Sequence, residues 1–170
     1  YAAWAAALAA RAADLGFDAF VTTDDFAFKT GMFFSPRVFR ELVVPRYERI
    51  ARELAIPWIL HSDGDISAAL DDLVELGVAA IHPLEKGAMD ILAVKRRYGG
   101  HLCLVGNVEM DLLARGSPGE VEREVRWLLA NIAPGGGYIL ASGNSLANYL
   151  STENILAMSR AARELGNYPI

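Results

Sequence analysis

Hydrophobic and polar residues follow one another along this chain in a recurring unit. An amphipathic segment of helical length leads through a glycine into a short apolar run, and the run ends in a polar tip. Each apolar run has four to six residues without alternation, which is typical of strands with both faces buried in a parallel sheet. The predicted strands are centred on Phe20, Ile59, Ala80, Leu104 and Ile139.

The segments between these strands carry signals for helix starts. Ser35 followed by Pro36 predicts a helix that runs to about residue 54, with a kink or break at Pro45. Ser117 and Glu120 have the spacing of a capping box and open a further long helix. Strands that alternate with helices predict βαβ units with right-handed crossovers, and therefore an α/β fold with a parallel sheet.

The number of units bears on the architecture. A closed barrel takes eight strands and roughly 250 residues, whereas a doubly wound sheet can be built from five. The doubly wound sheet usually has a glycine-rich phosphate loop after its first strand, but here that strand leads into Thr22-Thr-Asp-Asp25. The chain is therefore predicted to be the C-terminal five βα units of a TIM-like (β/α)8 barrel, forming a single domain over residues 1–170.

Five units of a barrel leave two strand edges unpaired and one sheet face uncovered. The mean hydropathy of +0.22 is high for a soluble domain, and the chain begins with Tyr inside an apolar helix. We therefore expect either a homo-oligomer or an N-terminal half, absent from this sequence, that covers the exposed surface.

The composition of the chain indicates which partners are not expected and in which cellular compartment the protein is expected. The net charge of −5 argues against a nucleic-acid partner bound through phosphate contacts. The single cysteine, Cys103, excludes a disulfide framework and predicts a reducing compartment, most simply the cytoplasm. No apolar stretch reaches the roughly 20 residues that a membrane span needs, so no membrane partner is expected.

Polar residues gather at the C-terminal ends of the predicted strands, where parallel α/β folds hold their functional sites. In chain order these residues are Asp24, Asp25, His61, Asp63, Asp65, His82, Glu85, Asn107, Glu109, Ser142, Asn144 and Ser145. Because parallel strands end at one edge of a sheet, we expect these side chains to converge on an acidic, histidine-containing mouth.

Several of these residues also have a purely structural interpretation. Asp65 is expected to cap the helix that begins near residue 66 rather than to act in chemistry. His61 and His82 are each open between a role in the site and packing in the core. Asp24 and Asp25 are adjacent and point to opposite sides of a strand end, so one of them is expected to face the mouth.

His61 and Asp63 are residue types that bind metals, and they lie two positions apart on one face of a strand. Neighbouring strand ends offer further ligands. We predict a metal site formed by His61, Asp63 and Glu85. The residues predicted to carry the chemistry are His61, Asp63, Glu109 and Asn144. The residues predicted to bind substrate are Asp24, Asp25, Asn107 and Ser142.

Five strings taken together resemble the uroporphyrinogen decarboxylase (URO-D) superfamily, which includes uroporphyrinogen decarboxylases and cobalamin-dependent methyltransferases. The first is DD followed by G-x-FFSPRVF and P-x-Y, after the first strand. The others are ILHSDGDI, LDDLVELGVAAIHPLE, YGGHLCLVGNVE and GGYILASGN with STENILAM. The resemblance covers nearly the whole chain and implies a (β/α)8 barrel of about twice this length, in which these strands are the fourth to the eighth.

The strand ends differ from both branches of this superfamily. Porphyrinogen decarboxylases share Gly106-Asn107 but usually continue with Leu-Asp-Pro, where this chain has Val108-Glu109-Met110, and they usually end the last strand in Gly-His-Gly. The zinc-dependent methyltransferases have His-x-Cys-Gly on the strand that carries His61, and a second cysteine after the last strand. Here Asp63 replaces the first cysteine and Asn144 the second, while the STENILAM ending is more similar to the methyltransferases.

The resemblance implies an enzyme of corrinoid-linked methyl transfer, assisted by a divalent metal such as zinc that activates a substrate oxygen. Its partner would be a small-molecule substrate or a corrinoid protein. The first alternative is a uroporphyrinogen decarboxylase, a carboxy-lyase of tetrapyrrole biosynthesis without a cofactor, in which acidic strand ends steer pyrrole N–H groups. The second is a tetrapyrrole- or corrinoid-binding protein without catalysis, whose His61 and Asp63 would tolerate alanine.

Overall fold

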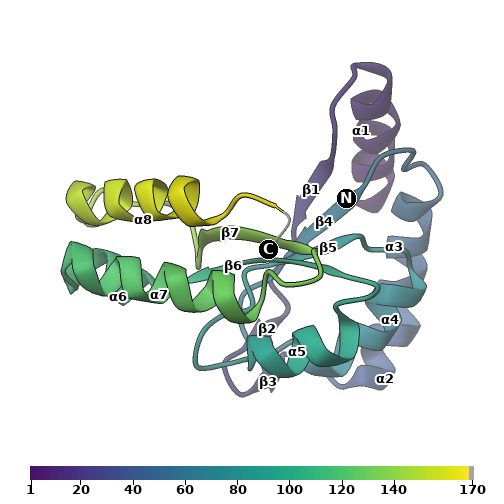
Figure 1. Cartoon of the computed structure of the whole chain (residues 1–170). Helices are drawn as coiled ribbons and strands as arrows, with labels where there is room; N and C mark the ends of the chain where they lie inside the picture. Colours follow the sequence, from purple (N-terminus) through teal and green to yellow (C-terminus); the bar gives the residue numbers. More distant parts are fainter. Residues whose placement is uncertain (169–170) are drawn as a thin grey trace.

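The computed structural model describes residues 1–168 (Figure 1). A parallel sheet of five strands forms its centre, in the order β1–β4–β5–β6–β7. The strands are β1 (Phe20–Thr23), β4 (Trp58–His61), β5 (Ala80–His82), β6 (Cys103–Val108) and β7 (Tyr138–Ser142). The order of these strands in the sheet is their order in the chain. Each pair of neighbours is parallel and is connected by a crossover that contains a helix. The predicted parallel strands and their sequential order are confirmed.

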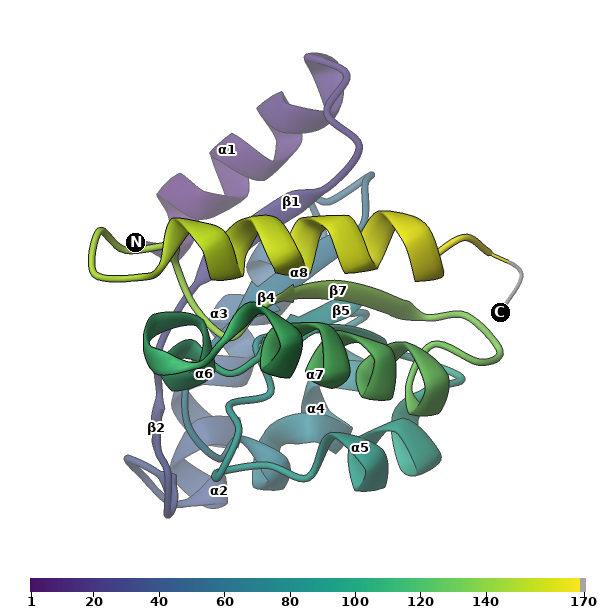
Figure 2. The same cartoon turned by 60° about the vertical axis from the view of Figure 1, so that its left-hand side comes forward.

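The helices all lie on the outer side of this sheet. They are α1 (Ala2–Asp14), α2 (Pro36–Val38), α3 (Val44–Ala51), α4 (Leu70–Glu75), α5 (Ile91–Tyr98), α6 (Met110–Arg115), α7 (Pro118–Asn131) and α8 (Thr152–Leu165). Figure 2 shows α7 and α8 side by side, where they pack against each other next to β7. Within residues 1–168 no helix combines the length and the apolar character needed to cross a membrane.

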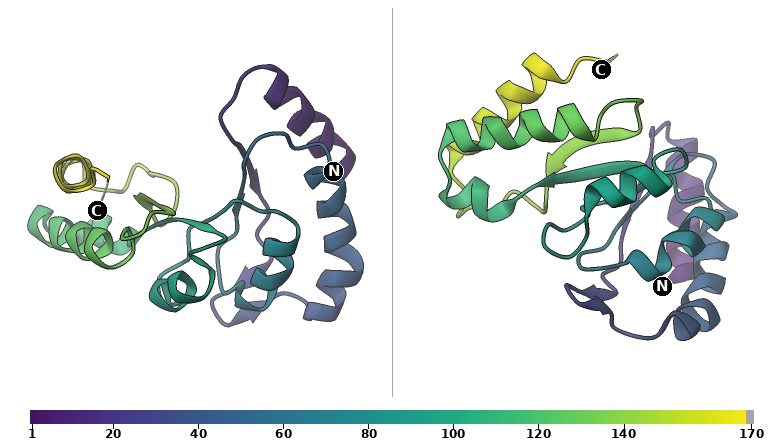
Figure 3. Two further views of the ribbon diagram at one scale, coloured as in Figure 1. Left: turned by 45° about the vertical axis from the view of Figure 1, so that its right-hand side comes forward. Right: turned by 60° about the horizontal axis from the view of Figure 1, so that its bottom comes forward.

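The two faces of the sheet differ in what covers them. On the outer face Trp58, Leu60 and Leu104 pack against the helices and are at most 2% exposed, which stabilises the fold by roughly 1.5–3 kcal/mol for each such side chain. On the inner face Val21 is 57% and Ile139 50% exposed. In the described part of the chain no helix crosses this inner face (Figure 3). The expectation that a further polypeptide surface covers it stays a prediction.

The long helix predicted from residue 35 is broken into consecutive segments. Ser35 caps it as expected, because its hydroxyl oxygen accepts the Val38 N–H at 3.3 Å. A π-helical turn, η1 (Phe39–Val43), separates α2 from α3. Pro45 lies at the start of α3 and has no N–H to donate to the preceding turn, which accounts for the break.

A short hairpin that the sequence did not predict lies over the loop after β4. Its strands, β2 (Ala27–Phe28) and β3 (Gly31–Met32), have two residues each and leave no periodic signal. Asp65 N–H donates to the Phe28 carbonyl at 2.8 Å. Gly64 permits this approach, because its φ is +83° and a Cβ there would meet the Ala27 carbonyl oxygen at 2.6 Å.

Candidate functional site

The candidate site lies at the C-terminal ends of β1, β4, β5 and β7, at the rim of the inner face. His61 ends β4 and His82 ends β5, and the two residues are partners in the parallel register. Strand alternation directs both rings to the inner face, where they line a cavity of about 370 Å³. Val21, Ile59 and Val105 form the apolar part of its wall. The histidines therefore stand at the mouth of an apolar trough.

Two carboxylates approach the imidazole of His61. Its Nε2 lies 3.7 Å from Asp25 Oδ1 and 3.9 Å from Asp63 Oδ1. One ligand atom from each of the three residues lies within 4.8 Å of the others. Of the three predicted metal ligands, His61 and Asp63 belong to this group. Glu85 lies outside the group, and Asp25 takes its place.

The carboxylate of Asp63 is held on one side only. Asn144 donates a hydrogen bond from Nδ2 to Asp63 Oδ2 at 2.8 Å. The backbone N–H of Asp63 in turn donates to Asp25 Oδ1 at 3.0 Å. Asp63 Oδ1 is buried and has no hydrogen-bond partner among the described residues. A buried polar atom left unpaired costs about 1–3 kcal/mol, and a cation beside it would offset this cost.

Asp24 and Asp25 have different surroundings, as expected for adjacent residues at a strand end. The hydroxyl of Tyr47, on α3, donates to Asp24 Oδ2 at 2.9 Å. Burial of the phenol, with the negative charge of Asp24 beside it, raises the pKa of Tyr47 well above its ordinary range. Asp24 is thus engaged on the outer, helical side of the sheet, and Asp25 is the residue that joins the group at the mouth.

The two histidines are in direct contact with each other. Their Nδ1 atoms are 2.6 Å apart, and the rings are stacked with centroids 4.9 Å apart. The Nε2 of His82 lies 3.1 Å from the backbone carbonyl oxygen of Ser142. Burial lowers the pKa of His82 below its ordinary value of 6.5 and outweighs the hydrogen bond to the Ser142 carbonyl, which acts in the opposite direction. The Ser142 hydroxyl donates to the Asn144 carbonyl at 2.7 Å, so it stabilises the loop after β7.

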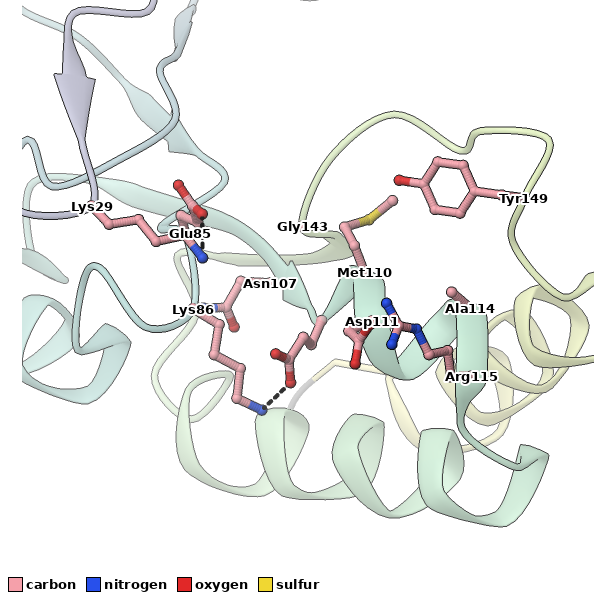
Figure 4. A pocket seen from close by; sticks show the side chains of 11 residues that line it. Lys29, Glu85, Lys86, Asn107, Met110, Asp111, Ala114, Arg115, Gly143 and Tyr149 are labelled. Carbon is pink, nitrogen blue, oxygen red and sulfur yellow. Dashed lines mark ion pairs between the residues drawn. The ribbon is translucent and has the colours of Figure 1, made fainter.

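The other predicted residues line a second cavity of about 470 Å³, shown in Figure 4. Glu85 pairs with Lys29 at 3.1 Å and accepts the Gly64 N–H at 2.9 Å. Glu109 lies 3.8 Å from Lys86. Asn107 is 3% exposed, and its amide donates to the Leu84 carbonyl at 2.7 Å. These three residues therefore take part in ion pairs or backbone hydrogen bonds away from His61.

The sequence reasoning missed the cations of this second cavity. Lys29 lies in the hairpin that was not predicted. Lys86 directly follows Glu85 after a predicted strand, so the strand pattern alone could have identified it as a residue of the same strand end. Arg115 belongs to the last turn of α6 and pairs with Asp111 at 2.9 Å. Asp65 has the structural role expected of it, since its carboxylate accepts the Ser67 N–H at 2.9 Å, but the N-cap residue of the 3-10 turn η2 (Ser67–Ala69) is Ile66 and not Asp65.

The group of Asp25, His61 and Asp63 fits a divalent metal in its donor chemistry. One imidazole and two carboxylates are ligand types for zinc, and a fourth position stays available for substrate. Zinc–ligand bonds of about 2.0–2.2 Å in a tetrahedron place ligand atoms about 3.4 Å apart. The distances from His61 Nε2, 3.7 and 3.9 Å, exceed this spacing slightly, and all three ligand atoms lie within 4.8 Å of one another. The unpaired Asp63 Oδ1 is the atom that most needs a cation.

Comparison with known proteins shows which family this chain belongs to. The family model for uroporphyrinogen decarboxylase (URO-D) matches residues 2–165. A methylcobamide:CoM methyltransferase from Methanosarcina barkeri is 28% identical over 131 residues, which are 76% of this chain and 37% of that protein. A uroporphyrinogen decarboxylase from Xanthomonas euvesicatoria pv. vesicatoria is 27% identical over 143 residues, 77% of this chain and 39% of that protein.

A solved structure shares the fold. A methyltransferase from Methanosarcina mazei superposes with a TM-score of 0.80 at 23% identity, covering 98% of this chain and 48% of that one. The chain therefore spans about half the length of that protein, and less than half of the curated relatives it matches. The likeness confirms the α/β, TIM-like architecture with parallel strands.

Proposed function

Because this chain belongs to the uroporphyrinogen decarboxylase (URO-D) family, we propose that it acts in corrinoid-linked methyl transfer assisted by a divalent metal. One observation carries the proposal. The buried Asp63 Oδ1 has no hydrogen-bond partner among the described residues and lies 3.9 Å from His61 Nε2, and Asp25 Oδ1 lies 3.7 Å from the same ring nitrogen. The three potential ligand atoms lie within 4.8 Å of one another, and Asp63 Oδ1 among them has no hydrogen-bond donor in the described residues, which favours a cation.

Each residue of the site has a definite part in this proposal. Asp25, His61 and Asp63 would hold the metal, which supplies a Lewis acid for negative charge on a substrate oxygen or sulfur. Asn144 orients Asp63 through the hydrogen bond to Oδ2, so the free Oδ1 stays directed at His61. The apolar wall of the adjoining trough would exclude water from the reacting groups and receive the apolar part of a substrate or corrinoid.

The relatives support the corrinoid part of the proposal. The Methanosarcina barkeri relative is named for methyl transfer from a methylcobamide to CoM. Net transfer of this kind moves a methyl group from cobalt to a thiol sulfur, the cobalt retains the electron pair, and the thiol proton is released. Asp63 and Asn144 occupy the positions of the family's two cysteines, so the oxygen and nitrogen donors of this site form a harder ligand set than thiolates would.

A second candidate function is the decarboxylation of a porphyrinogen. Two observations favour it: the 27% identity to the Xanthomonas decarboxylase and the half-exposed carboxylate of Asp25 at the mouth. A carboxylate in that position could accept hydrogen bonds from pyrrole N–H groups without a metal.

The test compares both reactions in the full-length protein supplied with zinc. Methylcobalamin is incubated with coenzyme M, and its demethylation is followed by absorbance. Uroporphyrinogen is assayed in parallel by chromatography of its products. We expect demethylation in the wild type and a loss of about 100-fold or more in His61→Ala and Asp63→Ala. Asp65→Ala is the matched control, since Asp65 lies in the same loop but accepts only the Ser67 N–H.

Two results would contradict the proposal. Decarboxylation of uroporphyrinogen without demethylation of methylcobalamin would establish the second candidate function. Binding of cobalamin or porphyrin with equal affinity by the wild type and both alanine variants, without turnover, would indicate a binding protein.

A further inference from the structure

A continuous chain of hydrogen bonds runs from the backbone of β7 to His61, and each link has a defined direction. The Ser142 carbonyl oxygen can only accept, so His82 Nε2, 3.1 Å away, carries a proton. A neutral imidazole has a single N–H, which leaves His82 Nδ1 as an acceptor. The Nδ1 of His61 lies 2.6 Å from it and must therefore be the donor.

The same hydrogen bonds determine whether Nε2, on the other side of the His61 ring, carries a proton. With its proton on Nδ1, a neutral His61 has a lone pair on Nε2. This atom faces Asp25 Oδ1 at 3.7 Å and Asp63 Oδ1 at 3.9 Å. Three electron-rich atoms directed at one another are mutually repulsive unless a cation lies between them.

We infer that His82 is a positioning residue that holds His61 in the Nδ1–H tautomer, so that Nε2 is presented as an electron-pair donor to the cation site. The inference rests on the proposed function for the identity of the cation as a metal. The hydrogen-bond direction follows from the Ser142 carbonyl acceptor and a neutral His82, and it does not depend on metal binding.

Without His82 the opposite tautomer would be favoured. The Nε2–H form of His61 could donate to Asp25 or Asp63 directly, and that proton would have to leave before a metal could bind. Metal-binding histidines commonly donate their second N–H to a carboxylate, a backbone carbonyl or water. Here a second histidine takes that place and is itself fixed by the Ser142 backbone carbonyl, which no side-chain substitution removes.

Nuclear magnetic resonance measures the tautomer directly in metal-free, ¹⁵N-labelled protein. The 170 residues contain three histidines, and their ring signals are assigned by single substitution. At a pH where the rings are neutral, long-range ¹H–¹⁵N correlation is expected to show His61 with Nδ1 protonated and Nε2 unprotonated. A predominant Nε2–H form of His61 in the wild type would overturn the inference, whether or not the protein binds metal.

Zinc titration of three variants tests the consequence for the site. His82→Leu removes the acceptor, and we expect the affinity for zinc to fall about 10–100-fold. His82→Gln offers a side-chain oxygen to His61 Nδ1–H and is expected to recover most of that loss. The matched control is His101→Leu, because His101 is exposed and lies outside the site. Circular dichroism establishes that each variant is folded.

The outcomes separate this inference from the proposed function. A wild type with the Nδ1–H tautomer that binds no zinc supports the hydrogen-bond chain and contradicts the proposed metal. A folded His82→Leu variant that binds zinc as tightly as the wild type would overturn the positioning role while leaving the metal site intact.

Discussion

Asn144 donates a hydrogen bond to Asp63 Oδ2 across 2.8 Å, although 81 positions separate the two residues in the chain. The contact joins the loop after β7 to the loop after β4, which are not neighbouring strands in the sheet. Curvature of the sheet brings the two strand ends together, as it does in a barrel. The hydrogen bond occupies one carboxylate oxygen and leaves the other directed at His61.

Asn144→Ala is expected to weaken zinc binding by about 10–100-fold, since Asp63 would no longer be oriented. The fold should be retained, because this side chain lies at the partly exposed rim of the site. Competition titration with a chromophoric chelator measures the affinity. Asn131→Ala is the control, because Asn131 is an exposed asparagine on α7 whose amide donates to the Trp127 carbonyl. Equal zinc affinity in the Asn144 variant and the control would refute this role.

The adjacent Asp24 and Asp25 are expected to respond differently to the same substitution. Asp25→Asn removes an anionic ligand and should weaken zinc binding by about 100-fold. Asp24→Asn should leave zinc binding unchanged but lower the free energy of unfolding by about 1 kcal/mol, because Tyr47 loses a charged acceptor. Zinc titration and urea unfolding of both variants provide the test. If Asp24→Asn impaired zinc binding as much as Asp25→Asn, it would be wrong to place Asp24 on the helical side of the sheet and Asp25 alone beside His61.

The sheet and its strand order could be predicted because they depend on signals spread over many residues. Apolar runs, glycine positions and helix caps such as Ser117 with Glu120 agree with one another, and the capping box is present as predicted. The short β2–β3 hairpin could not be predicted, because two residues carry no period. The exposure of Val21 and Ile139 also differs from the expectation of two buried faces, since in the described residues the helices cover only one.

The composition of the site could be predicted only in part. Strand ends identify which residues reach the mouth, but loop conformation decides where each side chain points. Leu84 adopts a left-handed φ of 57°, which a leucine in a sequence gives no reason to expect. The next residue, Glu85, pairs with Lys29 and Gly64 instead of joining His61. Asp25 enters the group because Asp24 is bonded to Tyr47, a contact across helix and strand that no local pattern contains.

Asn154 is expected to stabilise the fold without affecting the site. Its side chain is 1% exposed, and its amide donates to the Leu113 carbonyl at 3.1 Å and the Gly116 carbonyl at 2.7 Å. These bonds join the first turn of α8 to the end of α6. Asn154→Ala should lower the free energy of unfolding by about 1–3 kcal/mol, because buried carbonyls lose their donor. Denaturant unfolding measures the change, and a loss no larger than that of Asn131→Ala would contradict the prediction.

The capping box of α7 is expected to make stability depend on pH. Hydrogen bonds from the Ser117 backbone N–H and hydroxyl lower the pKa of Glu120 below its ordinary value of 4.5. The unfolded chain therefore takes up this proton first as the pH falls. The stabilisation is present above pH 4.5 and is lost as the pH falls through the lower folded-state pKa.

Glu120→Gln should accordingly destabilise the protein at pH 7 and have a smaller effect at pH 3. Thermal unfolding at both pH values measures the difference, with Glu122→Gln on the exposed side of the same helix as the control. A difference between wild type and Glu120→Gln that is the same at both pH values would show that the charge of Glu120 does not contribute.

The zinc content of the purified protein decides whether Asp25, His61 and Asp63 hold a metal. Protein saturated with zinc and freed of excess ion by gel filtration is analysed by mass spectrometry of the metal, beside the variants Asp25→Asn, His61→Ala and Asp63→Asn and the control Asp65→Asn. We predict one zinc ion per chain in the wild type and the control, and less than about a tenth of this in each of the three variants. Zinc contents that are equal in all five proteins, or a wild type that retains none, would contradict it.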